Sequence, residues 1–189
     1  MTTMNTEERN QYVQEMESAK TKYYEEHSKN RFFKNSQKLD CATNISQQMD
    51  IQKMIQCTVF QIPNTNILYY NYLVFKTYAN DQVTSILYQY VVALVDKVLK
   101  EYSSFEFHVN LKSFTISAAQ RYYNIICSVF DENTSFTGQM TKLVIYHTPS
   151  VISNIRQLLY NSIKDIVDKV EYCYKDSDAK IAKLFDISS

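Results

Sequence analysis

The chain has 189 residues, of which 45% are hydrophobic and 21% charged, with 20 basic and 20 acidic side chains. This length suits one domain with a sizeable core, and the balanced charge argues against a nucleic-acid partner. Gly138 is the single glycine, which excludes the glycine-rich loops that cradle nucleotide phosphates.

The first part of the chain, residues 1–56, is polar and predicts a helical arm that precedes an α/β domain at residues 57–189. From Thr6, a candidate N-cap, apolar residues recur at helical spacing on an otherwise polar helix. The stripe consists of Tyr12, Val13, Met16, Ala19, Tyr23 and Tyr24. Such a helix needs a partner surface, in its own domain or in another protein. Residues 6–34 are therefore a candidate site for a protein partner or for self-association.

The rest of the arm and the α/β domain follow from periodicity. Residues 35–44 read as a polar linker, and residues 46–55 as a short helix. Strands are then expected at 57–62, 67–75, 105–111, 142–147 and 170–174, and helices at 81–102, 117–130, 149–159, 163–167 and 177–185. Ser117 with Gln120 forms a capping box, and Thr148 with Pro149 forms a helix start signal. This alternation predicts a single mixed, mainly parallel sheet flanked by helices.

From about Val59 to Phe185, the order of these elements together with several short motifs resembles the CRAL-TRIO (Sec-fourteen-like) lipid-binding family. His108-Val-Asn-Leu-Lys-Ser-Phe-Thr-Ile-Ser117 matches the family's strand ending in Asp-Leu-x-Gly, with Asn110 for the Asp and Ser113 for the Gly. His147-Thr148-Pro149 stands at the family's Asn-Ala-Pro corner, and Asp168-Lys169-Val170-Glu171-Tyr172 at its Lys-Ile strand. The resemblance covers roughly two thirds of the chain and rests on the order of elements together with these motifs.

The resemblance implies a CRAL-TRIO-like fold and a phospholipid or other hydrophobic ligand. In the phosphoinositide-handling branch a Glu and a Lys frame the headgroup. Lys169 matches that Lys, whereas Gly138 stands in place of the Glu. A lone lysine can still hold a phosphate, although a solvated lysine at the edge of a strand explains Lys169 equally simply. His147 is a second candidate, because ligands bind at the carboxyl ends of strands in open α/β sheets.

Many of the aromatic residues could line an apolar pocket, with hydroxyls that orient a ligand. They are Tyr69, Tyr70, Tyr72, Phe75, Tyr88, Tyr90, Tyr122 and Tyr123. The alternative is that they fill the core. The candidate ligand-binding residues are therefore Tyr70, Tyr72, Tyr122 and Tyr123, together with Lys169 and His147.

The sequence contains no motif of a known catalytic site. His108 is expected to have a hydrogen-bonded structural role, and corner geometry is the simpler interpretation of His147. No set of His, Cys, Asp and Glu has metal-ligand spacing, and no cofactor is expected. The four cysteines are widely spaced and read as reduced thiols in a cytosol-like compartment. We expect no signal peptide and no membrane span.

Two hypotheses remain open. In the first, the protein is a non-enzymatic binding domain for a lipid or other hydrophobic ligand, cytoplasmic and peripheral at membranes. In the second, it is a relative without a pocket that works through protein-protein contacts, as an adaptor or as a structural protein. If the protein is viral, its expected location is the virion. The second hypothesis is motivated by Gly138 in place of the acid and by the amphipathic N-terminal arm. The composition, rich in Asn, Lys, Ile and Tyr, is typical of an AT-rich genome such as that of a protist or a large DNA virus.

Overall fold

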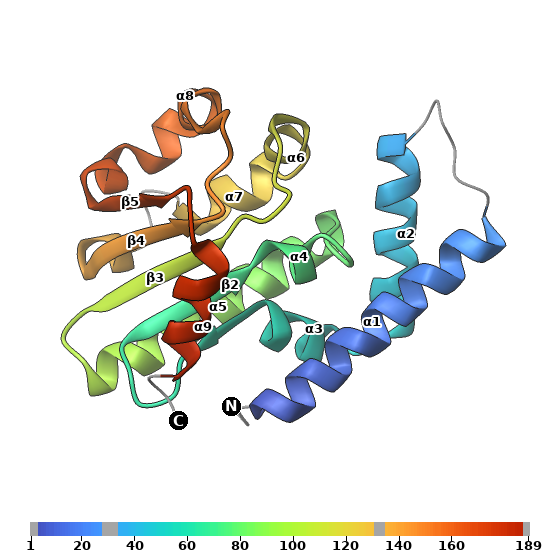
Figure 1. Ribbon diagram of the computed structural model, residues 1–189, viewed down its shortest axis with the longest axis horizontal. Helices are drawn as coiled ribbons and strands as arrows, with labels where there is room; N and C mark the ends of the chain where they lie inside the picture. Colours follow the sequence, from blue (N-terminus) through green and yellow to red (C-terminus); the bar gives the residue numbers. More distant parts are fainter. Residues whose placement is uncertain (1–3, 28–33, 131–134, 187–189) are drawn as a thin grey trace.

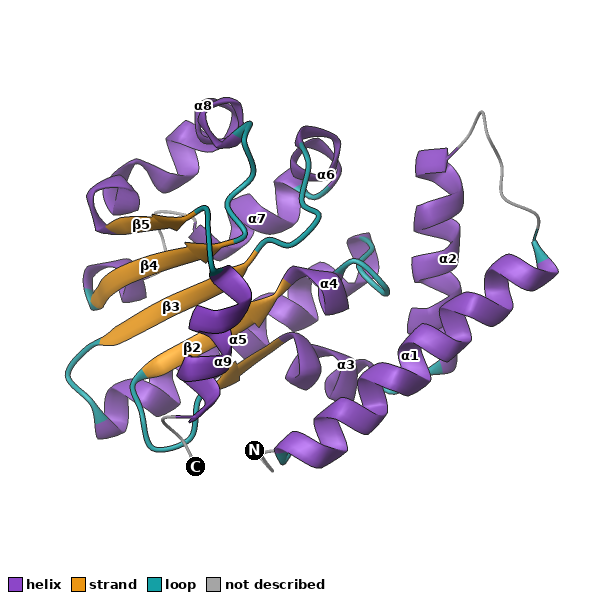
Figure 2. Ribbon diagram, viewed as in Figure 1, coloured by secondary structure: helices purple, strands orange, loops and turns teal. Residues whose placement is uncertain are grey.

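The computed structural model describes residues 4–27, 34–130 and 135–186, and it has one five-stranded sheet flanked by helices (Figures 1 and 2). The strands are β1 (Val59–Gln61), β2 (Ile67–Asn71), β3 (Phe105–Asn110), β4 (Met140–Tyr146) and β5 (Val170–Cys173). They lie in sequence order across the sheet; β1 pairs antiparallel with β2, and β2 to β5 are parallel. The predicted fold class, a mixed and mainly parallel sheet, is confirmed.

Helices cover the two faces of the sheet unequally. The connections between parallel strands carry α5 (Thr84–Glu101), α6 (Ile116–Arg121), α7 (Tyr123–Phe130) and α8 (Ile152–Ile163), with short 3₁₀ helices at Asp81–Val83, Ser135–Gly138 and Lys164–Lys169. In Figure 1, α5, α7 and α8 lie behind the sheet, and α9 (Ser177–Asp186) crosses its front. Successive crossovers that place their helices on one face are what right-handed β–α–β connections produce.

The long helix α5 confirms the clearest periodic signal in the sequence. Its apolar residues recur at i, i+3, i+4 and i+7, so they form one stripe that packs on the sheet. The buried members of this stripe are Leu87, Tyr90, Val91, Leu94, Val95 and Val98.

The N-terminal segment forms α1 (Thr6–Glu26), α2 (Lys34–Gln48) and α3 (Ile51–Thr58). The N-cap of α1 is Asn5, one residue before the expected Thr6, and it forms a capping box with Glu8. Met16 and Tyr23 of α1 are buried in the main hydrophobic cluster. The apolar stripe of α1 therefore packs in its own domain, one of the two alternatives that the sequence left open. Residues 28–33 of the predicted partner segment lie outside the described residues.

Two parts of the N-terminal half differ from expectation. Residues 35–44 are not a linker, because they belong to α2. Cys41, Ala42 and Ile45 lie on one face of that helix and are buried, and this burial outweighs the polar composition. Cys57 and Thr58 end α3 rather than begin a strand, so β1 has only three residues.

Three further boundaries differ. The predicted strand at 67–75 ends at Asn71, whose side chain accepts a hydrogen bond from Leu73 N and caps the one-turn helix α4 (Tyr72–Phe75). Thr115, not Ser117, caps α6 through Ala118 N. Thr148 does not cap α8, because its hydroxyl donates to Ile145 O and the helix begins three residues after Pro149.

The front face of the sheet is partly apolar and partly polar. Leu184 and Phe185 of α9 pack with Phe60 and Tyr69. Val144, Tyr146 and Cys173 form a second apolar cluster on this face, and an ion pair joins Lys142 Nζ of β4 to Glu171 Oε2 of β5 at 2.6 Å. None of the described helices is both long and apolar enough to cross a membrane.

Candidate functional site

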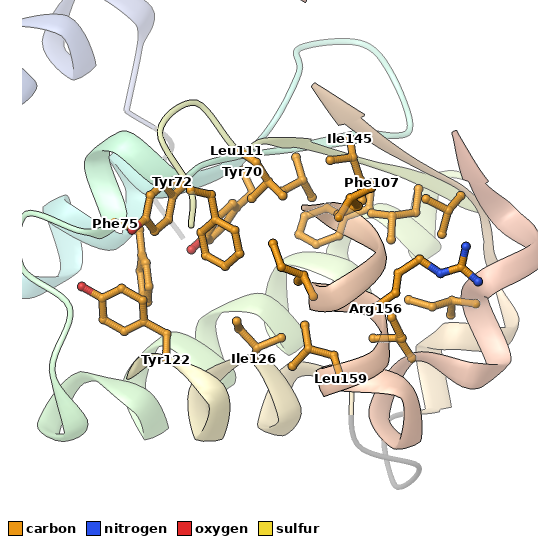
Figure 3. A pocket seen from close by; sticks show the side chains of 18 of the residues that line it. Tyr70, Tyr72, Phe75, Phe107, Leu111, Tyr122, Ile126, Ile145, Arg156 and Leu159 are labelled. Atoms are coloured by element: carbon orange, nitrogen blue, oxygen red, sulfur yellow. The ribbon is translucent and has the colours of Figure 1, made fainter. Parts of the chain in front are cut away.

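An apolar pocket lies between the back of the sheet and the layer formed by α5, α7 and α8 (Figure 3). Its cavity volume is about 150 Å³. The wall from the sheet, from α4 and from the loops beside it is Tyr70, Tyr72, Phe75, Phe107, Val109, Leu111, Phe114, Leu143, Ile145, Val170 and Tyr172. The wall from the helices is Leu87, Val91, Tyr122, Ile125, Ile126, Ile152, Ile155, Arg156, Leu159, Ile163 and Ile166.

The alternation of β-strands explains why the sheet contributes these side chains. In β3, Phe107 and Val109 face the pocket, while His108 and Asn110 face the front of the sheet, because successive side chains point to opposite faces. β4 repeats the pattern with Leu143 and Ile145. The strands therefore build an apolar floor on one side only.

One end of the pocket is aromatic. The Tyr72 and Phe114 rings meet edge to face with centroids 4.8 Å apart, and Phe75 and Tyr122 do so at 5.1 Å. Tyr70 packs on Phe75 with centroids 5.7 Å apart. Edge-to-face contacts of this kind stabilise packed rings beyond their buried area.

Tyr70 carries a polar group in this apolar end. The residue is half-buried, and burial is the main cause that raises the pKa of the phenol well above its ordinary value. The hydroxyl has no hydrogen-bond partner among the described residues, and it lies at the border of the pocket in Figure 3. No fully buried side-chain oxygen or nitrogen among the described residues lacks a partner, so the Tyr70 oxygen keeps contact with solvent, where a water or an acceptor atom of a ligand can bind it.

The structure brings together three of the six candidate ligand-binding residues. Tyr70, Tyr72 and Tyr122 line the pocket. Tyr123 lies on the outer side of α7 with 37% of its surface exposed. Lys169 does not line the pocket, and its Nζ donates to the Thr137 carbonyl at 2.9 Å. The roles of all these candidates in ligand binding stay predictions.

The remaining aromatic residues lie in three different places. Phe75 lines the pocket, whereas Tyr69 is buried on the front face of the sheet and Tyr90 in the main core. Tyr88 of α5 is half-buried and belongs neither to the pocket lining nor to a core cluster, so each reading fits only some of the aromatic residues.

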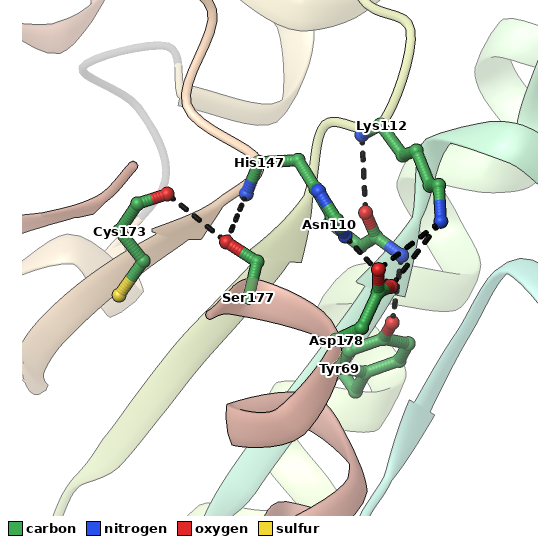
Figure 4. Close-up of polar contacts among 7 residues, drawn as sticks. All are labelled: Tyr69, Asn110, Lys112, His147, Cys173, Ser177 and Asp178. Atoms are coloured by element: carbon green, nitrogen blue, oxygen red, sulfur yellow. Dashed lines mark hydrogen bonds and ion pairs between the residues drawn. The ribbon is translucent and has the colours of Figure 1, made fainter. Parts of the chain in front are cut away.

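His147, the sixth candidate, belongs to a polar cluster at the carboxyl ends of the strands (Figure 4). Its φ of 51° lies in the left-handed region, so it turns the chain after β4, as the corner interpretation predicts. Its Nε2 donates to Asp178 Oδ1 at 3.0 Å, and Lys112 Nζ donates to the same oxygen at 3.2 Å. Lys112 foremost, and then His147, lowers the pKa of the Asp178 carboxyl.

The hydrogen bonds of this cluster anchor α9 to the carboxyl ends of the strands. Ser177 Oγ accepts from His147 N at 2.9 Å and donates to Cys173 O at 3.1 Å, so its hydroxyl is already engaged. The imidazole of His147 contacts Asp178 rather than Ser177. A nucleophile needs a base in hydrogen-bonding reach, and this pairing does not provide one.

His108 has the hydrogen-bonded environment that the sequence analysis expected. Its Nδ1 lies 2.8 Å from Tyr146 Oη, and its Nε2 lies 3.0 Å from Glu106 Oε2. Burial lowers the pKa of His108, although the hydrogen bond with Glu106 acts in the opposite direction. A neutral imidazole satisfies both contacts, because it can accept from the phenol and donate to the carboxylate.

Within the described part of the chain, no three His, Cys, Asp or Glu residues are arranged to hold a metal ion. The four cysteines are free, and burial raises the pKa of Cys57 to about 11. The thiol of Cys57 is therefore a poor nucleophile.

Sequence reasoning did not single out Ile126, Ile155, Arg156 or Leu159 as site residues. Ile155 and Leu159 belong to a stripe that was assigned to the helix core, and that stripe is the signal that could have found them. Arg156 has no such signal, because its place beside the pocket depends on how α8 packs.

Comparison of the chain with protein-family models and with curated proteins finds no match. The functional interpretation therefore rests on the fold and on the pocket.

Proposed function

We propose that this protein binds a small apolar or amphiphilic molecule in the pocket between the sheet and α5, α7 and α8. The observation that carries the proposal is the lining, in which nearly every side chain is aliphatic or aromatic. Ligand sites are concave, mostly apolar and equipped with a few convergent polar groups. The Tyr70 hydroxyl provides one such group.

The position of the pocket gives further support. Some lining residues at or just past the carboxyl ends of the strands stay half-buried, among them Val109, Leu111, Ile145 and Tyr172. Ligands of open α/β sheets bind beside this edge. We therefore expect a ligand to enter from the carboxyl edge, where the aromatic residues Tyr70, Tyr72 and Phe114 also lie.

The volume sets the size of the buried part of the ligand. An apolar cavity of about 150 Å³ holds a benzene-sized molecule, or about six carbon atoms. Burial of each methylene contributes about 0.8 kcal/mol, so six carbon atoms give a binding free energy of about 5 kcal/mol. This corresponds to a Kd on the order of 0.2 mM. A longer chain that continues along the half-buried rim would bind more tightly.

Lipids are the class of ligand that the CRAL-TRIO resemblance adds to this proposal. Membership of that family, lipid as the ligand and action at a membrane surface are parts of the proposal that still need their own tests. The non-enzymatic nature of the protein is also part of it.

Calorimetric titration with 1-octanol tests whether the pocket takes up an alkyl chain. Val109→Phe places a larger side chain in the cavity at a strand position that tolerates aromatic residues. We expect this variant to bind 1-octanol at least tenfold more weakly than the wild type. Val13→Phe is the matched control, because Val13 lies on α1 and does not line the pocket. Equal affinity in all three proteins would contradict the proposal.

An adaptor function is the second candidate. The observation that favours it is the outer face of α8, where Leu158 and Tyr160 are 37% and 59% exposed. The apolar stripe of α1 gives it less support, because Met16 and Tyr23 are buried in the protein's own core. Sedimentation of Leu158→Glu and Tyr160→Glu variants tests this candidate. The adaptor function predicts that the wild-type protein associates with itself or with a partner, and that each of the two substitutions abolishes this association.

A further inference from the structure

Arg156 is the one charged residue among the described residues that line the pocket. It lies on α8, next to the buried Ile155 and one turn after Ile152, both of which also line the pocket. The residue itself is exposed. Its stem therefore completes the apolar wall while the guanidinium stays at the rim, which is how long cationic side chains are accommodated beside apolar surface.

The guanidinium of Arg156 has no hydrogen bond or ion pair with the described residues. Other arginines in the described part of the chain have protein partners. Arg9 donates to the Met4 and Gln56 carbonyls and stacks over the Phe60 ring at 3.6 Å, and Arg121 donates to Asn35. Among the described residues, no carboxylate lines the pocket beside Arg156. Its positive charge is therefore available to a bound anion.

Arg156 also marks the place where the apolar pocket meets a polar surface. A shallow depression on α8 is lined by Arg156 together with Ser153, Gln157, Leu158, Tyr160 and Asn161. In Figure 3 the guanidinium points away from the ring cluster of Tyr72, Phe75 and Tyr122. The site thus has an apolar interior with aromatic rings at one end and a cation beside polar groups at the other.

We propose that the ligand of this pocket is an amphiphile with an anionic head group, a carboxylate or a phosphate, which pairs with Arg156 while its alkyl chain occupies the pocket. This proposal rests on the proposed binding function and adds the charge of the ligand to it. Guanidinium presents paired N–H donors that match both anions. An apolar tail without an anion would leave the guanidinium in water and gain nothing from it.

Matched ligands of equal chain length separate the two levels of the proposal. Octanoate and octyl phosphate carry an anion on the chain, and 1-octanol carries none. We expect Arg156→Gln to weaken octanoate and octyl phosphate about fivefold to tenfold, as for the loss of one charge-assisted contact. The same substitution should leave the affinity for 1-octanol within about twofold, because the alkyl contacts are unchanged.

Lys183→Gln is the control variant, since it removes the same charge from an exposed position on α9, on the opposite face of the sheet. It should leave all three affinities unchanged. Higher salt should also weaken the anions but not the alcohol in the wild type, because ions screen the Arg156 charge.

The outcomes are distinguishable. If the wild type binds 1-octanol but Arg156→Gln changes none of the affinities, or changes all of them equally, the anionic ligand is excluded and the binding function stands. If the wild type binds none of the three ligands at millimolar concentration, the binding function itself falls, and the anionic ligand falls with it.

Discussion

His147 and Asp178 join the carboxyl end of β4 to the first turn of α9 through a hydrogen bond of 3.0 Å. The same carboxylate accepts from Lys112, which follows β3. A single acidic side chain therefore ties two neighbouring strand ends to the helix on the front of the sheet.

We expect the acid sensitivity of the protein to depend in part on Asp178. Its pKa in the folded protein lies below the ordinary value of 3.8, so its contribution to stability is present above that value and is lost as the pH falls through the folded pKa. Asp178→Asn removes this titration. The difference in Tm between wild type and variant should therefore shrink as the pH falls from about 5 to about 3. A difference that stays constant over this range would exclude a stabilising role for the contact.

Two tyrosines allow a matched test of the unpartnered hydroxyl in the pocket. Tyr78 Oη lies 2.7 Å from Thr58 Oγ1 in the core, whereas Tyr70 Oη has no partner among the described residues. Tyr78→Phe should lower the free energy of unfolding by about 1 kcal/mol, and Tyr70→Phe should leave it unchanged or raise it slightly. Urea unfolding measures both values. Equal losses in the two variants would mean that Tyr70 has a hydrogen-bond partner in solution.

Leu159 tests the pocket through stability. It is buried and lines the cavity, so Leu159→Ala should lower the free energy of unfolding by about 3 kcal/mol and enlarge the void. Because 1-octanol binds only the folded protein in this proposal, it should raise the Tm of the variant at least as much as that of the wild type. A variant whose Tm does not respond to 1-octanol would argue that the void is not open to ligands.

Arg9 tests how the N-terminal helices are held. It donates to the Gln56 carbonyl and stacks over the Phe60 ring, so it links α1 to the end of α3 and to β1. Arg9→Ala should lower the free energy of unfolding by about 2 kcal/mol, through lost hydrogen bonds and lost cation–π contact. The exposed Lys22 on the same helix is the control, and its replacement by Ala should cost less than about 0.5 kcal/mol. Similar losses for both would show that Arg9 does not anchor α1.

The periodic parts of the sequence predicted the fold correctly. The apolar stripe of α5 and the alternating apolar residues of β3 have one interpretation each, because their spacing suits only one secondary structure. The prediction of a linker at residues 35–44 was wrong, because the buried residues of α2, Cys41, Ala42 and Ile45, are few and stand among polar neighbours. The tertiary contacts of α2 outweigh that polar composition.

The site was harder to predict than the fold. Aromatic composition named Tyr70, Tyr72 and Tyr122 as candidates, and these three line the pocket, while their role in binding stays a prediction. It could not separate them from Tyr69 and Tyr90, which fill the core, because both groups lie on regular elements with the same periodicity. A cavity is the volume that packed side chains leave empty, and no local pattern encodes it.

Native mass spectrometry of freshly purified protein, followed by organic extraction, tests the binding function most directly. The proposal predicts a bound small molecule that is lost in Val109→Phe and retained in Val13→Phe, and the extracted compound should carry an alkyl or aromatic portion of the size of the pocket. A wild-type protein that carries no ligand and takes up neither 1-octanol nor octanoate would contradict it.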